Sequence, residues 1–289
     1  MTRRVVEAIQ EACPPQLFVI ADGPRSGRPD EKRRCRETRS VVEDIRCESL
    51  VHRNYADENL GLRQRVVSGL NWVFDHVDRA IILEDDCMPD RSFFSFCEEL
   101  LDRYADHSHV MSISGDNFQP RPRSEYSYYF SRYMHCWGWA TWRSAWRHYD
   151  VDMESWPEVR EGPWIEQLFA SDRAASYWRS VFDRVYQREV DSWAYVWQYS
   201  IWMNGGVNIL PEKNLVSNIG HGEEATHTRD AGWYTSRSIS TLKQPLEHPP
   251  CIVRHADADD YTQRWLYDQT TIRKIMSRTY QYLRNVLPN

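Results

Sequence analysis

Apolar positions follow two different periods in the first part of the chain. Short apolar runs that end in turn residues predict β-strands, and apolar residues three or four positions apart predict helices. The predicted strands cover residues 17–20, 48–55, 79–86 and 109–117, and the predicted helices cover 2–12, the end of 28–44, 62–74 and a segment that starts near Asp90. Strands that alternate with helices predict an α/β fold with a mixed, mostly parallel sheet flanked by helices.

The pattern changes near residue 120. Beyond it, aromatic and polar residues are mixed, and helices and one short strand follow each other less regularly. The predicted helices cover residues 163–190, 193–204 and about 260–286, and the predicted strand covers 207–211. We therefore expect two halves of a single domain, residues 1–120 and residues 121–289 with the C-terminal helix.

Composition narrows the class of protein. The 289 residues are 41% hydrophobic and 13% aromatic, which is enough to fill the core of one large domain. A net charge of -6 argues against a large basic surface for nucleic acid. Seven scattered cysteines without a C-x-x-C pair favour reduced thiols in a cytoplasmic protein.

No apolar run approaches the roughly 20 residues of a membrane span. The basic C-terminal helix could associate weakly with a membrane surface, although a solvated face is the favoured interpretation.

Three consecutive carboxylates stand at the end of the predicted strand 79–86. Glu84, Asp85 and Asp86 follow the apolar residues of that strand directly. Ligands bind outside the carboxyl ends of strands in parallel α/β sheets, and like charges this close need a cation or donors to offset their repulsion. Mg²⁺ and Mn²⁺ take carboxylate ligands and share their other positions with phosphates. A solvated turn that caps the helix at Asp90 is the alternative.

Several motifs in this order resemble one family. The strings "ILEDDC", "SGDNF", "HCWGWATW" and "NLVSNIG…ATHT", with "DSWAYVW" between the last two, resemble a group of bacterial sugar transferases and haemolysin-like proteins. That group is similar to the inverting N-acetylglucosaminyltransferase of complex N-glycan synthesis and to GT-A glycosyltransferases in general. The resemblance covers about residues 1 to 265. It implies a GT-A fold whose first half binds a nucleotide sugar and whose second half binds the acceptor.

The resemblance also implies roles for the three acids. Asp86 would bind Mn²⁺ or Mg²⁺, which bridges the diphosphate of a nucleoside-diphosphate sugar donor. Asp85 would face the ribose, and Glu84 would lie near the transferred sugar. A divalent cation offsets the charge that builds on a leaving diphosphate. The partners would be the donor and a glycan or small-molecule acceptor.

Four residues are candidate nucleotide contacts. The resemblance suggests that Asp22, with Arg25 beside it in "ADGPR", touches the base or ribose, but an Asp that caps a Gly-Pro turn explains the same letters. Asn59 and Arg63 in "ENLGLRQR" could approach a phosphate, since Arg offers a fork of donors. A solvated helix face is the alternative for Arg63.

Asp191 in "EVDSWAYVW" is the candidate catalytic base. Its place in an acid-plus-Trp segment before a helix matches the base of the related transferases. Such a base accepts a proton from the acceptor hydroxyl as that hydroxyl attacks the anomeric carbon. The pair Asp191-Ser192 also suits a helix N-cap. Asp116 in "SGDN" is the rival base, or else a ligand for donor hydroxyls.

The later motifs supply aromatic rings and histidines. Indole rings suit stacking on sugar faces, but packing around Gly138 is the favoured interpretation for at least half of the tryptophans at 137, 139, 142 and 146. His227 lies in the "ATHT" phrase, and the resemblance implies that it reaches the metal or the diphosphate. His221 departs from the family, which usually has an apolar residue there.

One expected strand is absent. The family opens with a strand before the helix seen here at 2–12, and a parallel sheet without it would leave unpaired backbone groups.

Two other functions remain open. A sugar nucleotidyltransferase would need a Gly-rich N-terminal loop with a basic residue, which is missing. A non-catalytic glycan-binding protein on a degenerate transferase scaffold would fit the tryptophans and the missing strand.

Overall fold

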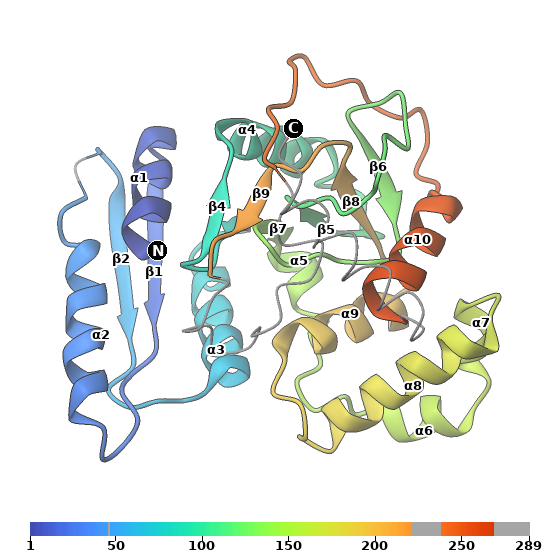
Figure 1. Ribbon diagram of the computed structural model, residues 1–289, viewed down its shortest axis with the longest axis horizontal. Coiled ribbons are helices and arrows are strands. Elements are labelled where there is room, and N and C mark those ends of the chain that lie inside the picture. Colours follow the sequence, from blue (N-terminus) through green and yellow to red (C-terminus); the bar gives the residue numbers. More distant parts are fainter. Residues whose placement is uncertain (46, 221–237, 269–289) are drawn as a thin grey trace, which may run out of the picture.

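The computed structural model describes residues 1–45, 47–220 and 238–268 (Figure 1). The helices are α1 (Thr2–Ala12), α2 (Pro29–Val41), α3 (Leu62–Phe74), α4 (Arg91–Arg103), α5 (Arg143–Trp146), α6 (Trp156–Glu161), α7 (Trp164–Leu168), α8 (Asp172–Tyr186), α9 (Trp193–Met203), α10 (Ala256–Thr262) and the π-helical η1 (Gln263–Tyr267). The strands are β1 (Gln16–Ala21), β2 (Leu50–Tyr55), β3 (Arg79–Ile82), β4 (Cys87–Pro89), β5 (Val110–Ser114), β6 (Tyr128–Ser131), β7 (Trp139–Trp142), β8 (Val207–Pro211) and β9 (Val216–Asn218).

A five-stranded sheet in the order β3-β7-β5-β8-β6 forms the centre of the molecule. Only β5 and β8 pair in parallel, whereas β7 runs antiparallel to β3 and β5, and β6 runs antiparallel to β8. The α/β class and the mixed sheet with flanking helices are confirmed. The prediction of a mostly parallel sheet is wrong for these neighbouring pairs, because β6 and β7 were not predicted. The sheet takes strands from both predicted halves.

The two unpredicted strands lack the alternation that marks a half-exposed strand. All four residues of β6, "YYFS", and of β7, "WATW", are buried. A strand covered on both faces shows no polar-apolar period, and its aromatic residues suit the pleated sheet. The aromatic segment after residue 120 therefore contains strands as well as turns.

A separate parallel pair, β1 with β2, lies at one side of the molecule, close to α1 and α2 (Figure 1). Its register places Gln16 opposite Leu50 and Ala21 opposite Tyr55. Both strands lie where the sequence predicted them, and they run in parallel as predicted. Neither has a fully buried residue, in contrast to β5, in which every residue is buried.

A cleft of about 1190 Å³ separates this pair from the five-stranded sheet. Within the described residues, β1 pairs only with β2, and β3 pairs only with β7, so one edge of each strand has no strand beside it. Apolar side chains from β1, β3 and the covering helices face the cleft, among them Leu17, Ile20, Leu70, Val73, Ile81 and Phe94.

Several helices lie where the apolar spacing predicted them, and two predicted helices differ from the structure. The helix expected over 2–12 is α1, and the one expected near Asp90 is α4, whose N-cap is Asp90, with Oδ1 accepting from the Ser92 N–H at 2.9 Å. The segment 163–190 contains two helices instead of one, α7 and α8. The helix predicted over 260–286 appears as α10 and η1, and residues 269–289 lie outside the described part. No helix that the structure describes is long and apolar enough to cross a membrane.

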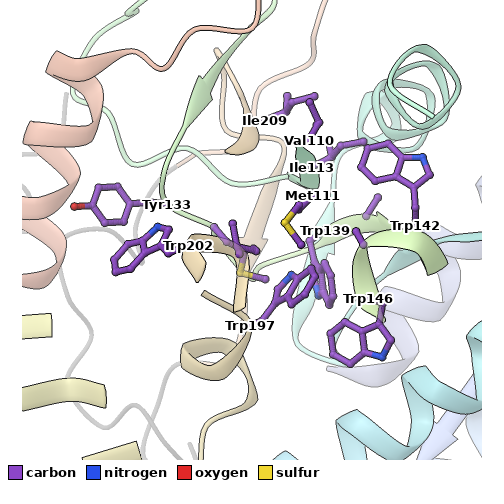
Figure 2. Packing of buried hydrophobic residues seen from close by; sticks show 14 of the residues in the cluster. Val110, Met111, Ile113, Tyr133, Trp139, Trp142, Trp146, Trp197, Trp202 and Ile209 are labelled. Atoms are coloured by element: carbon purple, nitrogen blue, oxygen red, sulfur yellow. The ribbon is translucent and has the colours of Figure 1, made fainter. Parts of the chain in front are cut away.

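Tryptophan rings fill the core between the sheet and α9 (Figure 2). Trp139 on β7 stacks on Trp193 of α9, with ring centroids 5.2 Å apart, and Trp146 packs against Trp197. Trp139, Trp142 and Trp146 are at most 5% exposed. The packing interpretation is therefore confirmed for these three, and of the four tryptophans only Trp137 is partly exposed.

Candidate functional site

The acidic residues lie in a turn, not in a strand. Strand β3 ends at Ile82, and the Cys87 N–H closes the turn by donating to the Glu84 carbonyl at 3.0 Å before β4 begins. The turn separates the three side chains. The Asp85 side chain is exposed and accepts a hydrogen bond from the Thr2 hydroxyl at 2.9 Å. The Asp85 carboxylate, in the turn after β3, therefore lies at the start of α1.

Asp86 faces the segment that follows β9. The Ile219 N–H donates to its carbonyl at 2.8 Å, and a Cβ on Gly220 would collide with its Oδ2. The backbone of Gly220 can approach this carboxylate only because glycine has no side chain. Residues 221–237 follow immediately, and the predictions for His221 and His227 lie outside the described residues.

Glu84 is largely buried, and the pKa of its carboxyl group is raised. Burial, followed by the nearby charge of Asp86, raises the pKa of its carboxyl group from 4.5 to about 7. A hydrogen bond with the Trp193 side chain lowers this pKa, while the charge of Asp85 raises it slightly further. At neutral pH this carboxyl group is divided between its two protonation states, so it can both accept and donate a proton.

Asp116 follows the end of β5 and is fully enclosed. Its Oδ1 accepts from the Trp137 N–H at 3.2 Å, and its Oδ2 lies 3.3 Å from Nδ1 of His135. Both side chains are 1% exposed. Burial raises the pKa of Asp116, and its contact with His135 opposes that rise. The pair therefore forms an internal acid-imidazole contact behind the acidic turn.

Two thiols show that these carboxylates lie close together. Burial raises the pKa of Cys87 and of Cys136 well above the usual value. The charges of Glu84, Asp86 and Asp116 raise both values further. The ends of β3 and β5 therefore bring three carboxylates around one small region, as expected for strands that point the same way.

Asp191 lies just before α9 and is exposed. The helix N-cap is the neighbouring Ser192, whose Oγ accepts from the Tyr195 N–H at 3.3 Å. The Asp191 carboxylate is therefore not used as the cap. Its Oδ2 lies 3.5 Å from where a Cβ on Gly61 would stand. Gly61 has a φ of 83°, a left-handed conformation that favours glycine.

Asp22 organises the loop before α3. Its Oδ1 accepts from the N–H groups of Gly23 and Leu60, both at 2.9 Å. Its Oδ2 accepts from the Asn59 side chain at 2.8 Å and from the Gly61 N–H at 3.2 Å. Four donors surround this carboxylate, which supports the turn-capping interpretation of Asp22 and gives Asn59 a structural partner.

The two arginines named as nucleotide contacts face other groups. Arg63 is 4% exposed and donates to the carbonyls of Val151 and Val185. Burial lowers the pKa of its guanidinium, and the repulsion from Arg188 adds to that effect. Arg63 thus ties α3 to the helical second half, which differs from both the phosphate-contact and the solvated-face interpretations. Arg25 is exposed and pairs with Glu31 at 3.3 Å.

Sequence reasoning missed several residues of this site. Trp193 stands next to the predicted "DSW" acid, but nothing in the sequence links it to Glu84. His135 precedes the tryptophan motif and gives no sign of its contact with Asp116. Within the part of the chain that the structure describes, no group of three or more His, Cys, Asp or Glu side chains is arranged to hold a metal ion.

Comparison with known proteins gives no family for this chain. No family model matches it. No curated protein matches it either. Its function is therefore inferred from the residues themselves.

Proposed function

We propose that this chain is a metal-dependent inverting glycosyltransferase with a GT-A fold. The donor is a nucleoside-diphosphate sugar, and the acceptor is a hydroxyl group on a glycan or a small molecule. The observation that carries the proposal is the gathering of Glu84, Asp86 and Asp116 at the ends of β3 and β5. Carboxylates at that edge of a mixed α/β sheet fit a reaction that needs a cation ligand and a proton acceptor.

The site offers two proton acceptors. Asp191 is exposed and stands against the glycine loop before α3, where an acceptor hydroxyl could reach it. Glu84 is less accessible, and its pKa of about 7 suits proton transfer at neutral pH. In either case the carboxylate takes the hydroxyl proton, the oxygen bonds to the anomeric carbon, and the nucleoside diphosphate leaves. We assign the base to Asp191, and we assign to Glu84 a place beside the transferred sugar.

In this proposal the protein holds the cation only in part. Burial raises the pKa of Glu84, and the charge of Asp86 raises it further, so the two carboxylates repel each other. Asp86 would hold Mn²⁺ or Mg²⁺, with the donor diphosphate completing the coordination. A bound cation would stabilise the negative charge of the leaving diphosphate.

The cleft between β1 and β3 supports the proposed fold. A single strand inserted there would join the β1–β2 pair to the five-stranded sheet, and apolar side chains already face that space. The Thr2 contact with Asp85 sets the start of α1 at the carboxyl end of β3.

A thermal-shift panel tests this function. UDP, GDP, dTDP and CDP are each added with Mn²⁺, Mg²⁺ or EDTA to the protein and to Asp86→Asn. We expect one nucleotide to raise Tm only with metal, and Asp86→Asn to lose most of that rise, because a ligand that binds the folded state stabilises it. Asp106→Asn is the control, since Asp106 is exposed in the turn after α4. A nucleotide-dependent rise that persists in both EDTA and Asp86→Asn would contradict the proposed metal role.

One observation favours a second function. Asp22 and Arg63, two expected donor contacts, are hydrogen-bonded within the protein. A glycan-binding protein on a transferase scaffold would not need these two side chains to bind a nucleotide. Glycan binding that persists in EDTA, without any nucleotide-dependent shift in Tm, would support that function instead.

A further inference from the structure

Two cysteines stand side by side where β1 and β2 begin. The register pairs Gln16 of β1 with Leu50 of β2. Cys13, the C-cap residue of α1, and Cys47 each stand three residues before one of these two partners. Adjacent strands are about 4.8 Å apart where this pairing begins, and a disulfide spans Cα separations of roughly 4.4 to 6.8 Å.

Hydrogen bonds hold the two segments together at this level. The Leu50 N–H donates to the Pro15 carbonyl at 3.0 Å, and the Ser49 hydroxyl donates to the Pro14 carbonyl at 2.5 Å. The Cys47 sulfur lies 3.1 Å from the same hydroxyl oxygen. Cys13 is also among the side chains that lower the pKa of Cys47, so the two side chains lie near each other. The two sulfur atoms are therefore brought together by the backbone pairing.

This pair differs in reactivity from Cys87, Cys97 and Cys136. Cys13 is exposed and Cys47 is half-buried, so both can be reached from solvent. The Ser49 hydroxyl, with a smaller contribution from Cys13, lowers the pKa of Cys47. By contrast, burial raises the pKa of Cys87, Cys97 and Cys136 well above the usual value. A thiol reacts as its thiolate, which favours Cys47 as the attacking group.

We propose that Cys13 and Cys47 form a reversible disulfide by exchange with a low-molecular-weight disulfide such as oxidised glutathione. The Cys47 thiolate attacks one glutathione sulfur, forms a mixed disulfide and releases one glutathione thiolate. The Cys13 thiolate then attacks the Cys47 sulfur and releases the second. Two protein thiols are oxidised, one glutathione disulfide is reduced to two glutathione molecules, and the two thiol protons go to water or to the leaving thiolates.

The disulfide would change the wall of the cleft. Pro14 and Pro15 both line it, and they follow Cys13 directly. A bond from Cys13 to Cys47 closes a loop that contains β1 and α2, and it fixes these prolines against the start of β2. Closing a loop of this kind restricts the unfolded chain, so the oxidised protein should unfold at a higher temperature.

The test is a titration of the folded protein with mixtures of reduced and oxidised glutathione, followed by alkylation and peptide mass analysis. We expect two thiols to be lost together, one linked peptide containing Cys13 and Cys47, and a rise in Tm of about 5 °C. Cys13→Ser should stop at a glutathione adduct on Cys47, with no rise in Tm. Cys35→Ser is the matched control, because Cys35 is half-buried on α2 and should leave the linked peptide unchanged.

Two results would overturn the inference. One is separate glutathione adducts on Cys13 and Cys47 that never convert to the linked peptide. The other is a linked peptide that forms with Cys251 or between two chains as readily as between Cys13 and Cys47. Because neither serine variant removes a buried side chain, a folding defect is not expected to obscure these outcomes.

Discussion

Replacing Glu84 with glutamine should stabilise the protein at alkaline pH. The change removes a charge that the fold keeps poorly solvated, but it retains an oxygen that can accept the hydrogen bond from Trp193. The folded-state pKa of Glu84 is about 7, compared with a reference value of 4.5. At about 1.4 kcal/mol per pKa unit, ionising Glu84 in the folded protein costs roughly 3 kcal/mol.

The pH range follows from the direction of this shift. Below pH 4.5 the carboxyl group is protonated in both the folded and the unfolded chain, so it favours neither. Between 4.5 and about 7 the unfolded chain loses its proton first, and the folded protein loses stability as pH rises. Above pH 7 the full penalty is present. The glutamine variant has no such penalty, so its advantage should grow across this range and then remain constant.

Urea unfolding in EDTA measures the difference. We expect Glu84→Gln to unfold at the same urea concentration as the parent at pH 4.5, and to be more stable by about 1 to 3 kcal/mol at pH 8. Asp106→Asn is the control, because Asp106 is exposed in the turn after α4. Equal stability of Glu84→Gln and the parent at pH 8 would refute the claim that Glu84 is charged at a cost in the folded protein.

Two further predictions concern the first part of the chain. Asp22→Ala should lower the free energy of unfolding, measured by urea titration, by about 1 to 3 kcal/mol, because four donors lose their acceptor. An unchanged stability would mean that solvent replaces this carboxylate. A designed apolar strand of about five residues can be joined by a short turn before Thr2. It should fill the cleft and raise Tm by roughly 5 °C, whereas a Gly-Ser extension of equal length should not. Equal Tm values for both extensions would show that the cleft does not accept a strand.

Local patterns predicted what depends on neighbours in the sequence. The apolar spacing of Leu62, Val66 and Leu70 identified α3, and the Asp90 cap identified the start of α4. Both features arise from side chains that meet within one or two helical turns. The strand predicted over 79–86 begins where β3 begins, but β3 ends at Ile82 and the three acids lie in the turn that follows.

Long-range contacts could not be read in the same way. The charge of Arg63 suggested a phosphate contact or a solvated face, but two backbone carbonyls from the second half surround its guanidinium. The hydrogen bond between Glu84 and Trp193 joins residues that are far apart in the chain. Strands β6 and β7 were missed because burial on both faces removes the alternation that identifies strands.

The stacked pair of Trp139 and Trp193 gives the acidic turn a spectroscopic reporter. Two indoles whose planes are 21° apart couple their electronic transitions, and one of them is hydrogen-bonded to Glu84. Any proton, cation or sugar that changes the charge at Glu84 therefore acts directly on an absorbing pair. The near-ultraviolet circular dichroism of the protein becomes a label-free signal from its own proposed site.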